Sequence, residues 1–427
     1  MMEIILPQLT DNLLDVRTAR LRMLQAFEPL ETNDIMVEQS ADYILSSDIK
    51  AEVDIPGFLS SAMDGFAVRS SDLVNASKHN PIELKVVVDI PAGKLVEEKL
   101  QVGQAARIMT GAPLPEGADA IVPVEQTDFN YRYSGLKAPG TVKIYDNPTA
   151  GAHIRQIGED AREGDLVISA GQRLRAQELG LLSMLGIKVV SAYRKPRVGV
   201  FSSGDELLEK DKHLQPGKIY DANRPMLISL VEQAGAVAID LGISQDNEQS
   251  VLACLRMAVD ANADLIISTA GVSVGAFDFV RTVVEKNGHL DFWRVNMRPG
   301  KPICFGDFCD IPFIGLPGNP VAAFVGFHVF ISPAIFKMRG GDSLDQKTYK
   351  VKLLEAIESD GRESYLRVII NHQGGELSAR LTGHQGSGNL RSLVDANGLL
   401  IVPSGVKSMP ADSYADVCLI DDGFPEV

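Results

Sequence analysis

The stretch ISTAGVSVGAFDFV, residues 267–280, decides the fold of the central part of the chain. The apolar residues 265–267 run into glycines and hydroxyls, and a helical pattern then opens on Asp278. A strand that passes through a glycine-rich turn into a helix is typical of α/β proteins, and the N–H groups of such a turn often bind an anion. The stretch therefore predicts an anion site with a carboxylate beside it.

Strands and helices alternate on both sides of this stretch. Apolar runs and helical periodicity predict strands at 197–201, 236–242 and 263–269, and helices at 223–234, 247–261 and 278–287. Parallel strands need crossover helices, so residues 193–340 are expected to form one α/β domain with a parallel sheet. The apolar run 321–336 is too short for a membrane span and contains His328 and Pro333, so we expect a buried helix.

The flanking regions have a different character. Residues 14–28 carry apolar residues at helical spacing, whereas short alternating runs between about 50 and 150 predict an all-β module. Hairpins and one short helix are expected between 158 and 190, and short strands with turns follow residue 345. The predicted fold class is multidomain α/β plus β, with a central α/β parallel-sheet domain, a β-rich N-terminal insertion and a β-rich C-terminal domain.

Composition limits the possible partners. The chain has 427 residues and a formal net charge of −15. That length predicts about three or four domains. An acidic surface argues against nucleic acid and anionic membranes as partners, so an anionic ligand must meet a local basic patch. The four cysteines form no C-x-x-C pair and the N-terminus lacks signal-peptide features, so we expect reduced core cysteines in a soluble cytoplasmic protein.

Two motifs place acidic residues near predicted strand ends. In SSGDEL, residues 202–207, Ser203 and Glu206 fit a helix capping box; alternatively, the serines bind an anion while a divalent cation offsets the acidic residues. In DNEQSV, residues 246–251, Asp246 is well placed as a helix N-cap. Taken singly, each motif is explained by capping as well as by ligand binding.

The opening stretch contains a G-x-S-x-G pattern formed by Gly271, Ser273 and Gly275. The same pattern occurs in the nucleophile elbow of α/β-hydrolases, but no acid and histidine follow in a clear order, which disfavours a hydrolase. Asp278 falls in the first predicted helical turn, where the helix dipole favours an acidic residue in any case.

Two Pro-Gly loops follow further along the chain. Arg298 and Lys301 surround the first loop and could hold an oxyanion or phosphate, or could form a solvated basic turn. The second loop carries Pro317 and Pro320, and Pro320 suits the first turn of a helix. Both loops come after predicted strands, so we expect them to share the wall of a pocket.

Seven motifs in order give the chain a specific resemblance. They are SAMDGFA, IMTGAPLPEGADAIVPVE, SSGDEL, GVSVGAFD, RPGKP, LPGNP and GHQGSGNL. Together they resemble the molybdenum insertases of the MoeA family, which are similar to the E domain of gephyrin. The resemblance implies elongated homodimers of four-domain subunits, with an α/β domain related to the molybdopterin adenylyltransferases and a site at the dimer interface. The implied domains are 1–53 with 149–192, the inserted β module 54–148, the α/β domain 193–340 and the C-terminal β domain 341–427.

The resemblance also implies a reaction and its partners. Such enzymes take adenylylated molybdopterin and molybdate, insert molybdenum into the dithiolene and release AMP with the help of Mg2+. That chemistry agrees with the absence of a Cys or His metal cage, because the dithiolene of the substrate binds the molybdenum. A molybdopterin adenylyltransferase and apo-molybdoenzymes are the implied partner proteins.

Motif matches carry the family's functional residues onto this chain. The catalytic set is Asp64, Thr110, Glu206, Asp246, Asp278 and Lys301, and the binding set is Ser203, Gly271, Ser273, Gly275, Arg298, Pro317, Pro320 and Ser387. Asp246 and Asp278 would bind Mg2+, and the residues around Ser273 would cradle phosphate. Arg298 and Lys301 would hold molybdate or phosphate, with Arg367 joining Ser387 from the C-terminal domain.

Three positions depart from the residues common in the family. Ala270 stands where Gly is common, Arg298 where Lys is common and Phe66 where Tyr is common. A positive φ is unfavourable for alanine, so we expect a slightly different turn at Ala270. The planar guanidinium of Arg298 keeps the charge but changes the geometry offered to an oxyanion.

Rival functions remain open at this point. A molybdopterin adenylyltransferase acting on ATP would share the α/β domain, but such enzymes are typically that domain alone. A non-catalytic pterin-binding scaffold would favour a fused second domain and a long Pro/Ser-rich linker, and the sequence has neither. A tungsten-preferring paralogue would perform the same reaction with another oxyanion.

Overall fold

The structure is a computed structural model that describes residues 13–129, 135, 137–270, 279–292, 294–341, 347–373 and 375–420. Contacts between residues divide the chain into two compact units. The small unit contains residues 48–170 and 177–188, and the large unit contains the rest. The small unit is therefore an insertion into the large one.

A six-stranded sheet forms the centre of the large unit. Its order is β15 (Val237–Ser244), β12 (Arg197–Ser203), β16 (Leu265–Thr269), β20 (Ile311–Leu316), β19 (Cys304–Phe308) and β17 (Gly288–Phe292). The first four strands are parallel, which confirms the predicted α/β fold class and the predicted strands. At one edge β19 pairs antiparallel with both β20 and β17, so the sheet is not entirely parallel.

The antiparallel edge has a local cause. Cys309 and Asp310 have positive φ values of 52° and 64° and join β19 to β20 in a tight turn, which leaves no room for a crossover helix. The same turn exposes Cys309, whereas Cys254, Cys304 and Cys418 are buried. The expectation of four core cysteines was therefore wrong at Cys309, because Cys-Asp lacks the glycine or asparagine that usually marks such a turn.

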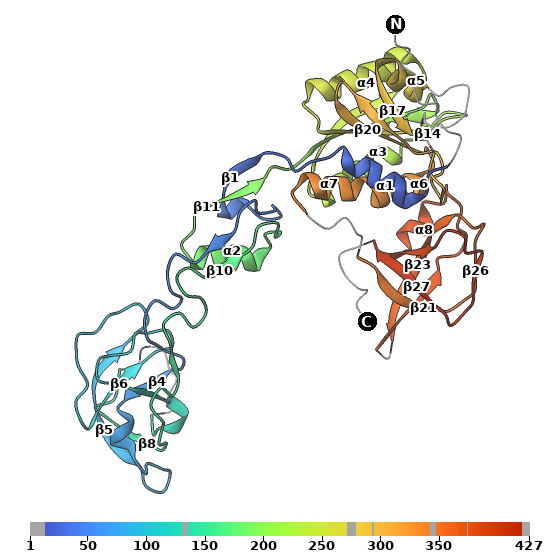
Figure 1. Cartoon of the computed structure of the whole chain (residues 1–427). Helices are drawn as coiled ribbons and strands as arrows, with labels where there is room; N and C mark the ends of the chain where they lie inside the picture. The colour runs from blue at the N-terminus through green and yellow to red at the C-terminus, as the bar shows by residue number, and fades with distance from the viewer. Residues whose placement is uncertain are drawn as a thin grey trace. The chain divides into compact units, whose positions relative to one another are not determined.

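Helices cover both faces of the sheet, as Figure 1 shows. The first face carries α4 (Glu248–Asp260) and α5 (Phe279–Asn287), and the second carries α1 (Val16–Gln25), α3 (Asn223–Gln233) and a long helix. Successive strand residues alternate between the two cores: Val200 packs into the core of the second face and Phe201 into that of the first. Burial of both faces explains why these strands appear in the sequence as continuous apolar runs.

The long helix consists of α6 (Pro320–Gly326), a π-helix (Phe327–Ile331) and α7 (Ser332–Met338). By length and composition it is the one helix of the described chain that could cross a membrane, but 78% of its apolar window is buried inside the protein. It is therefore the buried helix expected from residues 321–336. Pro333 has no N–H to donate to the residue four positions earlier, and the helix widens into the π-helix just before it.

A closed β-barrel forms the C-terminal part of the large unit and confirms the predicted β-rich domain. The strands β23 (Glu363–Gln373), β24 (Glu376–Leu381), β21 (Tyr349–Leu353), β27 (Tyr414–Leu419) and β25 (Gly398–Val402) pair in that order, and β25 pairs back to β23. Gly398 lies where the interior is crowded, since a Cβ there would be 2.5 Å from Cδ1 of Ile370.

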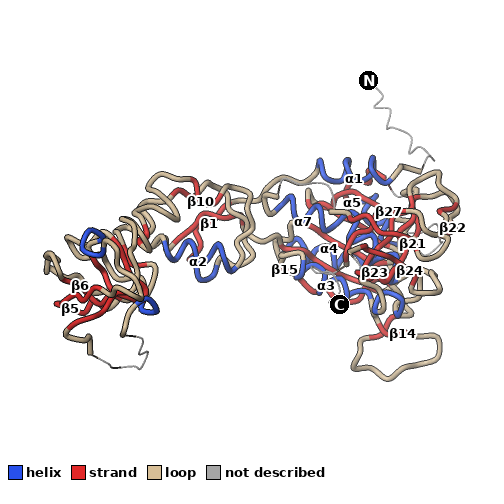
Figure 2. The backbone as a smooth tube through the Cα atoms, turned by 90° about the horizontal axis from the view of Figure 1, so that it is seen from below, coloured by secondary structure: helices blue, strands red, loops and turns tan. Residues whose placement is uncertain are grey.

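The regular structure of the small unit is mostly strand, drawn red between tan loops in Figure 2. Its five-stranded sheet has the order β7 (Ala120–Pro123), β4 (Gly65–Val68), β6 (Gln104–Ile108), β5 (Ile82–Ile90) and β8 (Thr141–Ile144). Glycine is required at the start of β4, because a Cβ on Gly65 would lie 2.1 Å from the carbonyl oxygen of Val122. This sheet is the predicted β-rich insertion, and α2 (Ala176–Met184) is the predicted short helix.

Candidate functional site

The strand order of the large sheet reverses beside β12. The chain passes from β12 to β15 on one side of it and then to β16 on its other side, with α3 and α4 on opposite faces. In open α/β sheets, ligands bind outside the carboxyl ends of the strands at such a switch point. The residues at this edge are Ser202 and Ser203 of β12 and Thr269 of β16.

The capping box predicted from Ser203 and Glu206 is not present. β12 extends through Ser203, and the next element is the short strand β13 (Leu207–Leu208), so no helix begins here. The Ser203 hydroxyl instead donates to Oδ1 of Asp246 at 3.2 Å. The Glu206 carboxylate folds over the neighbouring glycine, since a Cβ on Gly204 would meet Oε2 at 2.6 Å. Sequence periodicity cannot tell whether a capped helix or a second short strand follows β12. In both cases the preceding strand ends in two serines.

Asp246 is not the N-cap of α4, which was the expectation. Asn247 caps the helix and accepts from the Ser250 N–H at 2.9 Å. Asp246 and Asp205 exchange hydrogen bonds, each N–H donating to the other's carboxylate at 3.1 and 3.3 Å. The Asp246 carboxylate is thus held by neutral donors, with no ion pair to a described basic residue. Within the described residues no group of three His, Cys, Asp or Glu side chains is arranged to hold a metal.

A polar network lies behind this edge. The Ser202 hydroxyl donates to Asp221 at 3.0 Å and lies 3.0 Å from the Thr269 hydroxyl. Arg224 donates to Asp221 at 3.1 Å, to Asp240 at 2.5 Å and to Glu209 at 2.6 Å. Burial opposes its charge, but hydrogen bonds to Asp240 and Asp221 outweigh that effect and raise the pKa of Arg224. The network fixes the start of α3 against the carboxyl end of β12.

Basic residues gather where the barrel adjoins the Pro-Gly loops. Arg298 and Lys301 are both exposed, and Arg298 lies 3.7 Å from Asp360. Arg367 is fully buried, and its guanidinium donates only to Ser392 and to the carbonyls of His384 and Gly386, which leaves Nη1 without a partner. Burial, together with the charge of Arg298, lowers the pKa of Arg367 to about 10.

The loop of the two prolines contacts the barrel. Pro317 is buried after β20, and Pro320 occupies the first turn of α6, as predicted. The side chain of Asn319 donates to the Ser387 hydroxyl at 3.0 Å, and the Val321 N–H donates to the Ser387 carbonyl at 3.1 Å. The structure therefore brings Ser387 to the second Pro-Gly loop.

Two predicted residues lie together in the small unit. The Oδ1 atom of Asp64 accepts from both the N–H and the hydroxyl of Thr110 at 2.8 Å. Both side chains are exposed, so the Asp64 carboxylate also faces solvent. The pairing joins two motifs that are separated by 46 positions in the sequence.

Four predicted residues, Gly271, Ser273, Gly275 and Asp278, lie outside the described residues. Ala270 directly precedes them and has φ of 66°, so the expectation that alanine would avoid a positive φ was wrong. Its N–H donates to the carbonyl of Leu316 at 3.0 Å, which ties the residue to β20. Tertiary contacts thus hold alanine in a conformation that its Cβ disfavours.

We expect Ala270→Gly to raise the free energy of unfolding by about 0.5–1 kcal/mol. A left-handed residue with a Cβ costs roughly 1–2 kcal/mol, and the greater freedom of unfolded glycine offsets part of the gain. Denaturant unfolding measures the difference, with Ala261→Gly (φ −82°) as the control that should lose stability. Equal losses in both variants would show that Ala270 is unstrained.

Three residues at this site were not predicted: Asp221, Thr269 and Asn319. Each carries a weak signal in the sequence. Thr269 ends a predicted strand, Asn319 stands between the two predicted prolines, and Asp221 comes shortly before a predicted helix. Their partners are distant in sequence, so the contacts could not be inferred from spacing.

Family models match most of the chain. The MoeA N-terminal region (domains I and II) matches residues 14–186, a probable molybdopterin binding domain matches 199–337, and the MoeA C-terminal region (domain IV) matches 350–419. A molybdopterin molybdenumtransferase of Haemophilus influenzae is 37% identical over 400 residues, covering 91% of this chain and 94% of that protein. The chain belongs to the MoeA family of molybdopterin molybdenumtransferases.

Other members of the MoeA family are also similar to this chain in sequence and in structure. A molybdopterin molybdenumtransferase of Bacillus subtilis is 35% identical over 396 residues, covering 91% of this chain and 90% of that protein. The crystal structure of a molybdopterin biosynthesis MoeA protein from Pyrococcus horikoshii superposes with a TM-score of 0.78 at 28% identity, covering 96% of this chain and 100% of that one. The resemblance seen in the motifs is confirmed, and this MoeA-family chain is a transferase.

Proposed function

We propose that the chain inserts molybdenum into molybdopterin, taking adenylylated molybdopterin and molybdate as substrates and releasing AMP in an Mg2+-dependent step. The observation that carries the proposal is the buried Arg367 guanidinium, which has an unmatched donor and no described carboxylate partner. A buried cation of this kind is costly unless an anion neutralises it. Molybdate supplies two negative charges and four oxygen acceptors.

The carboxyl edge of the large sheet has groups suited to Mg2+ binding and to the cleavage of the phosphoanhydride that releases AMP. Asp246 offers a carboxylate without a described basic partner, and Ser203 and Asp205 hold its orientation through hydrogen bonds. Hard oxygen ligands of this type are those that Mg2+ prefers, and bound Mg2+ would neutralise the oxygens of a phosphoanhydride. We assign Asp246 to that role, with Asp278 as the second carboxylate.

The proposed chemistry needs no protein nucleophile. Water adds to one phosphorus of the pyrophosphate bridge, and the P–O–P bond breaks to give AMP and the phosphate of molybdopterin. The two dithiolene sulfurs replace two oxygens of molybdate, which leave as water with the two thiol protons and two protons from solvent. Arg298, Lys301 and Arg367 hold the anions, and charge stabilisation rather than covalent catalysis lowers the barrier. A molybdopterin adenylyltransferase would supply the substrate, and apo-molybdoenzymes would receive the product.

Anaerobic AMP release from adenylylated molybdopterin by the full chain with Mg2+ tests this proposal, with molybdate titrated against tungstate. We expect oxyanion-dependent release that Asp278→Asn lowers by at least about 100-fold, because a lost metal ligand removes several kcal/mol of charge stabilisation. The exposed Asp260, at the end of α4, provides the matched control Asp260→Asn.

The outcomes separate the rival functions. Tight pterin binding without AMP release would contradict the insertase and favour a scaffold, whereas synthesis of adenylylated molybdopterin from ATP would favour an adenylyltransferase. A lower half-saturating concentration for tungstate than for molybdate would identify a tungsten-preferring form of the same enzyme.

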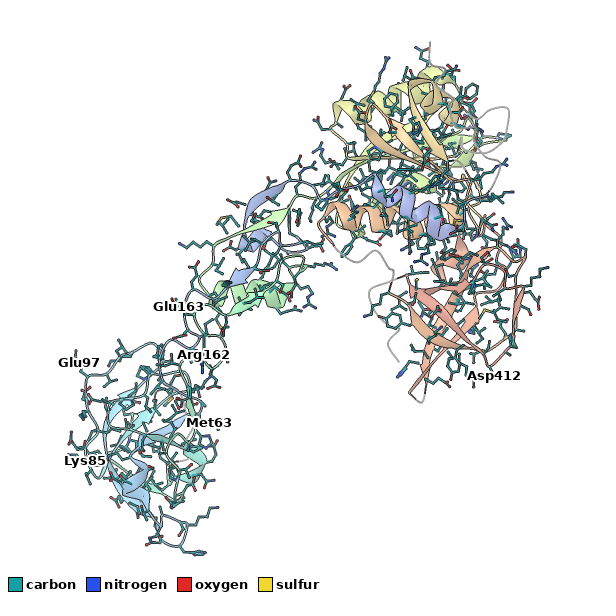
Figure 3. All side chains as sticks on the ribbon, in the orientation of Figure 1. Met63, Lys85, Glu97, Arg162, Glu163 and Asp412 are labelled. Atoms are coloured by element: carbon teal, nitrogen blue, oxygen red, sulfur yellow. The ribbon has the colours of Figure 1, made fainter. Side chains whose placement is uncertain are left out.

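We further propose that the chain forms a homodimer through the small unit. Five apolar side chains there are 37–50% exposed: Val53, Phe58, Leu59, Met63 and Ile157. Figure 3 labels Met63, which is adjacent in sequence to Asp64. The segments that carry these residues pair with one another at Ser60–Arg155 and Ile55–Ala161, so the segments lie side by side. Apolar patches of this kind usually mark an interface.

Light scattering coupled to size exclusion should give the mass of two chains. Met63→Lys together with Phe58→Glu should shift the mass to that of one chain, because charges in an apolar interface are costly to bury. Leu95→Lys is the control, since Leu95 is 84% exposed in the same unit and lies outside the patch. A monomeric wild-type chain, or a dimer that survives the double substitution, would contradict the proposal.

A further inference from the structure

A cavity of about 780 Å3 lies in the large unit and is lined by none of the site residues described above. Its walls come from α3, the long helix and the barrel strands β21, β25 and β27. Pockets of about 300–1,000 Å3 are the usual size for small-molecule sites. The cavity is therefore large enough for a ligand of its own.

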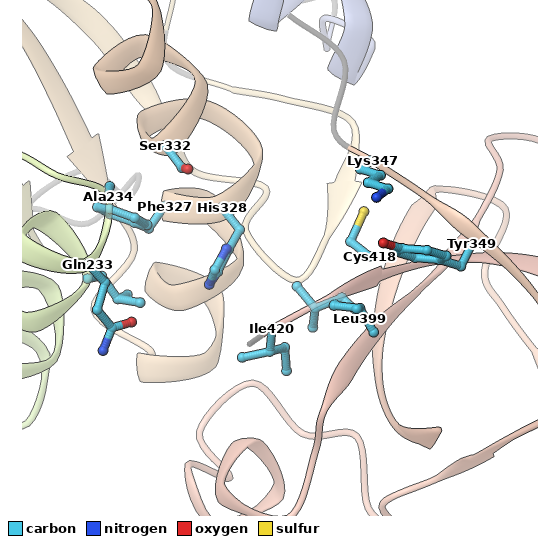
Figure 4. Close-up of a pocket in the computed structure, with 12 residues that line it drawn as sticks. Gln233, Ala234, Phe327, His328, Ser332, Lys347, Tyr349, Leu399, Cys418 and Ile420 are labelled. Atoms are coloured by element: carbon cyan, nitrogen blue, oxygen red, sulfur yellow. The ribbon is translucent and has the colours of Figure 1, made fainter. Parts of the chain in front are cut away.

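The lining changes in character along the cavity. The apolar lining residues include Phe327, Leu399 and Ile420. In Figure 4, Phe327 lies beside Ala234, whereas Leu399 and Ile420 lie nearer the middle. In Figure 4, Gln233 lies toward one end and Lys347, Tyr349 and Cys418 gather toward the other, with His328 between them. Ligand sites usually combine apolar walls with polar groups, and this lining offers both kinds.

The long helix is distorted where it borders the cavity. Phe327 and His328 belong to the π-helix, and Ser332 begins the α-helix that follows. Helical segments of this rare type occur frequently at functional sites. The distortion presents an imidazole and a hydroxyl from one helix to the same cavity.

One of the described lining residues carries a formal charge. Burial lowers the pKa of His328 to about 4 and raises the pKa of Cys418 to about 11, so both are neutral at neutral pH. Lys347 is the only charged side chain among the described lining residues, and its Nζ lies 5.3 Å from the centroid of the Tyr349 ring. It forms no ion pair with a described carboxylate. Among the described lining residues, this one positive group is the feature that favours an anionic ligand over a cationic one.

We propose that this cavity binds a small amphipathic carboxylate, with its apolar body along Phe327, Leu399 and Ile420 and its carboxylate on Lys347. A single lysine matches a monovalent carboxylate, whereas a phosphate dianion would need a second cation. The apolar body gains from leaving water. The proposal does not depend on the insertase function, because the two sites share no residue.

Calorimetric titration of the full chain with octanoate tests the proposal, with octylammonium as the probe of opposite charge. We expect saturable binding of one octanoate per chain and none of octylammonium. Lys347→Met should weaken octanoate binding by roughly 10- to 100-fold, because a hydrogen bond to a charged group is worth about 1.5–3 kcal/mol. Lys350→Met is the matched control, since Lys350 pairs with Asp416 at 3.0 Å outside the cavity.

A second variant tests the location of the site. Ser332→Phe fills the cavity and should abolish octanoate binding while AMP release stays at the wild-type rate. Absence of saturable octanoate binding by the wild-type chain would overturn the proposal. So would equal losses in Lys347→Met and Lys350→Met, or equal binding of octylammonium. If Ser332→Phe does not fold, the comparison of the two lysine variants still decides the question.

Discussion

Arg367→Met should raise the molybdate concentration that half-saturates AMP release by about 10- to 100-fold, because a hydrogen bond to a charged group is worth about 1.5–3 kcal/mol. The guanidinium is fully buried, donates to neutral partners and keeps one free donor for an anion. Methionine fills the space without the charge. The rate at saturating molybdate should change less than the half-saturating concentration.

Two further variants separate oxyanion binding from a merely structural role. Arg380→Met removes an exposed arginine from β24 and should leave the molybdate dependence unchanged. Arg367→Lys restores the charge but cannot keep the contacts to Ser392 and Gly386 together, so it should recover only part of the affinity. If Arg367→Met lowers the maximal rate and leaves half-saturation unchanged, Arg367 does not bind the oxyanion.

Arg224→Met should lower the free energy of unfolding by about 3 kcal/mol or more, the cost of breaking a buried ion pair by removing one partner. The Arg224 side chain is 11% exposed and that of Asp221 only 3%, so the remaining carboxylate has little access to water. Denaturant unfolding followed by circular dichroism measures the loss. Because Asp221 also accepts from Ser202, the variant should lower AMP release as well.

The control for this effect is Arg256→Met, which removes an exposed arginine from α4 and should change stability by less than about 0.5 kcal/mol. Arg224→Lys should remain destabilised, because an ammonium cannot reach Asp221, Asp240 and Glu209 together. If Arg224→Met is as stable as the wild-type chain, the prediction is wrong. The cost of removing Arg224 and its carboxylate partners from water would then cancel their mutual attraction.

Much of the fold could be predicted from the sequence because its signals are local. The strands around 197–201 and 263–269 are short apolar runs, and α3 and α4 show helical periodicity, so each carries its own evidence. Ordered motifs predicted the family because their residue types and order are properties of the chain itself. The motifs assigned Asp64 and Thr110 to the site separately, and only the structure showed that the two residues pair across 46 positions of sequence.

Only the tertiary structure decided which long-range contacts form. Asp246 and Ser203 fit local capping patterns, yet both are engaged by a segment about 40 residues away, and Asn247 caps the helix instead. Ala270 accepts a left-handed conformation because β20 holds its N–H, and Arg367 becomes a buried cation because the barrel closes around it. Local propensities of about 1 kcal/mol or less are easily outweighed by such contacts, so sequence patterns determine the elements and packing determines the site.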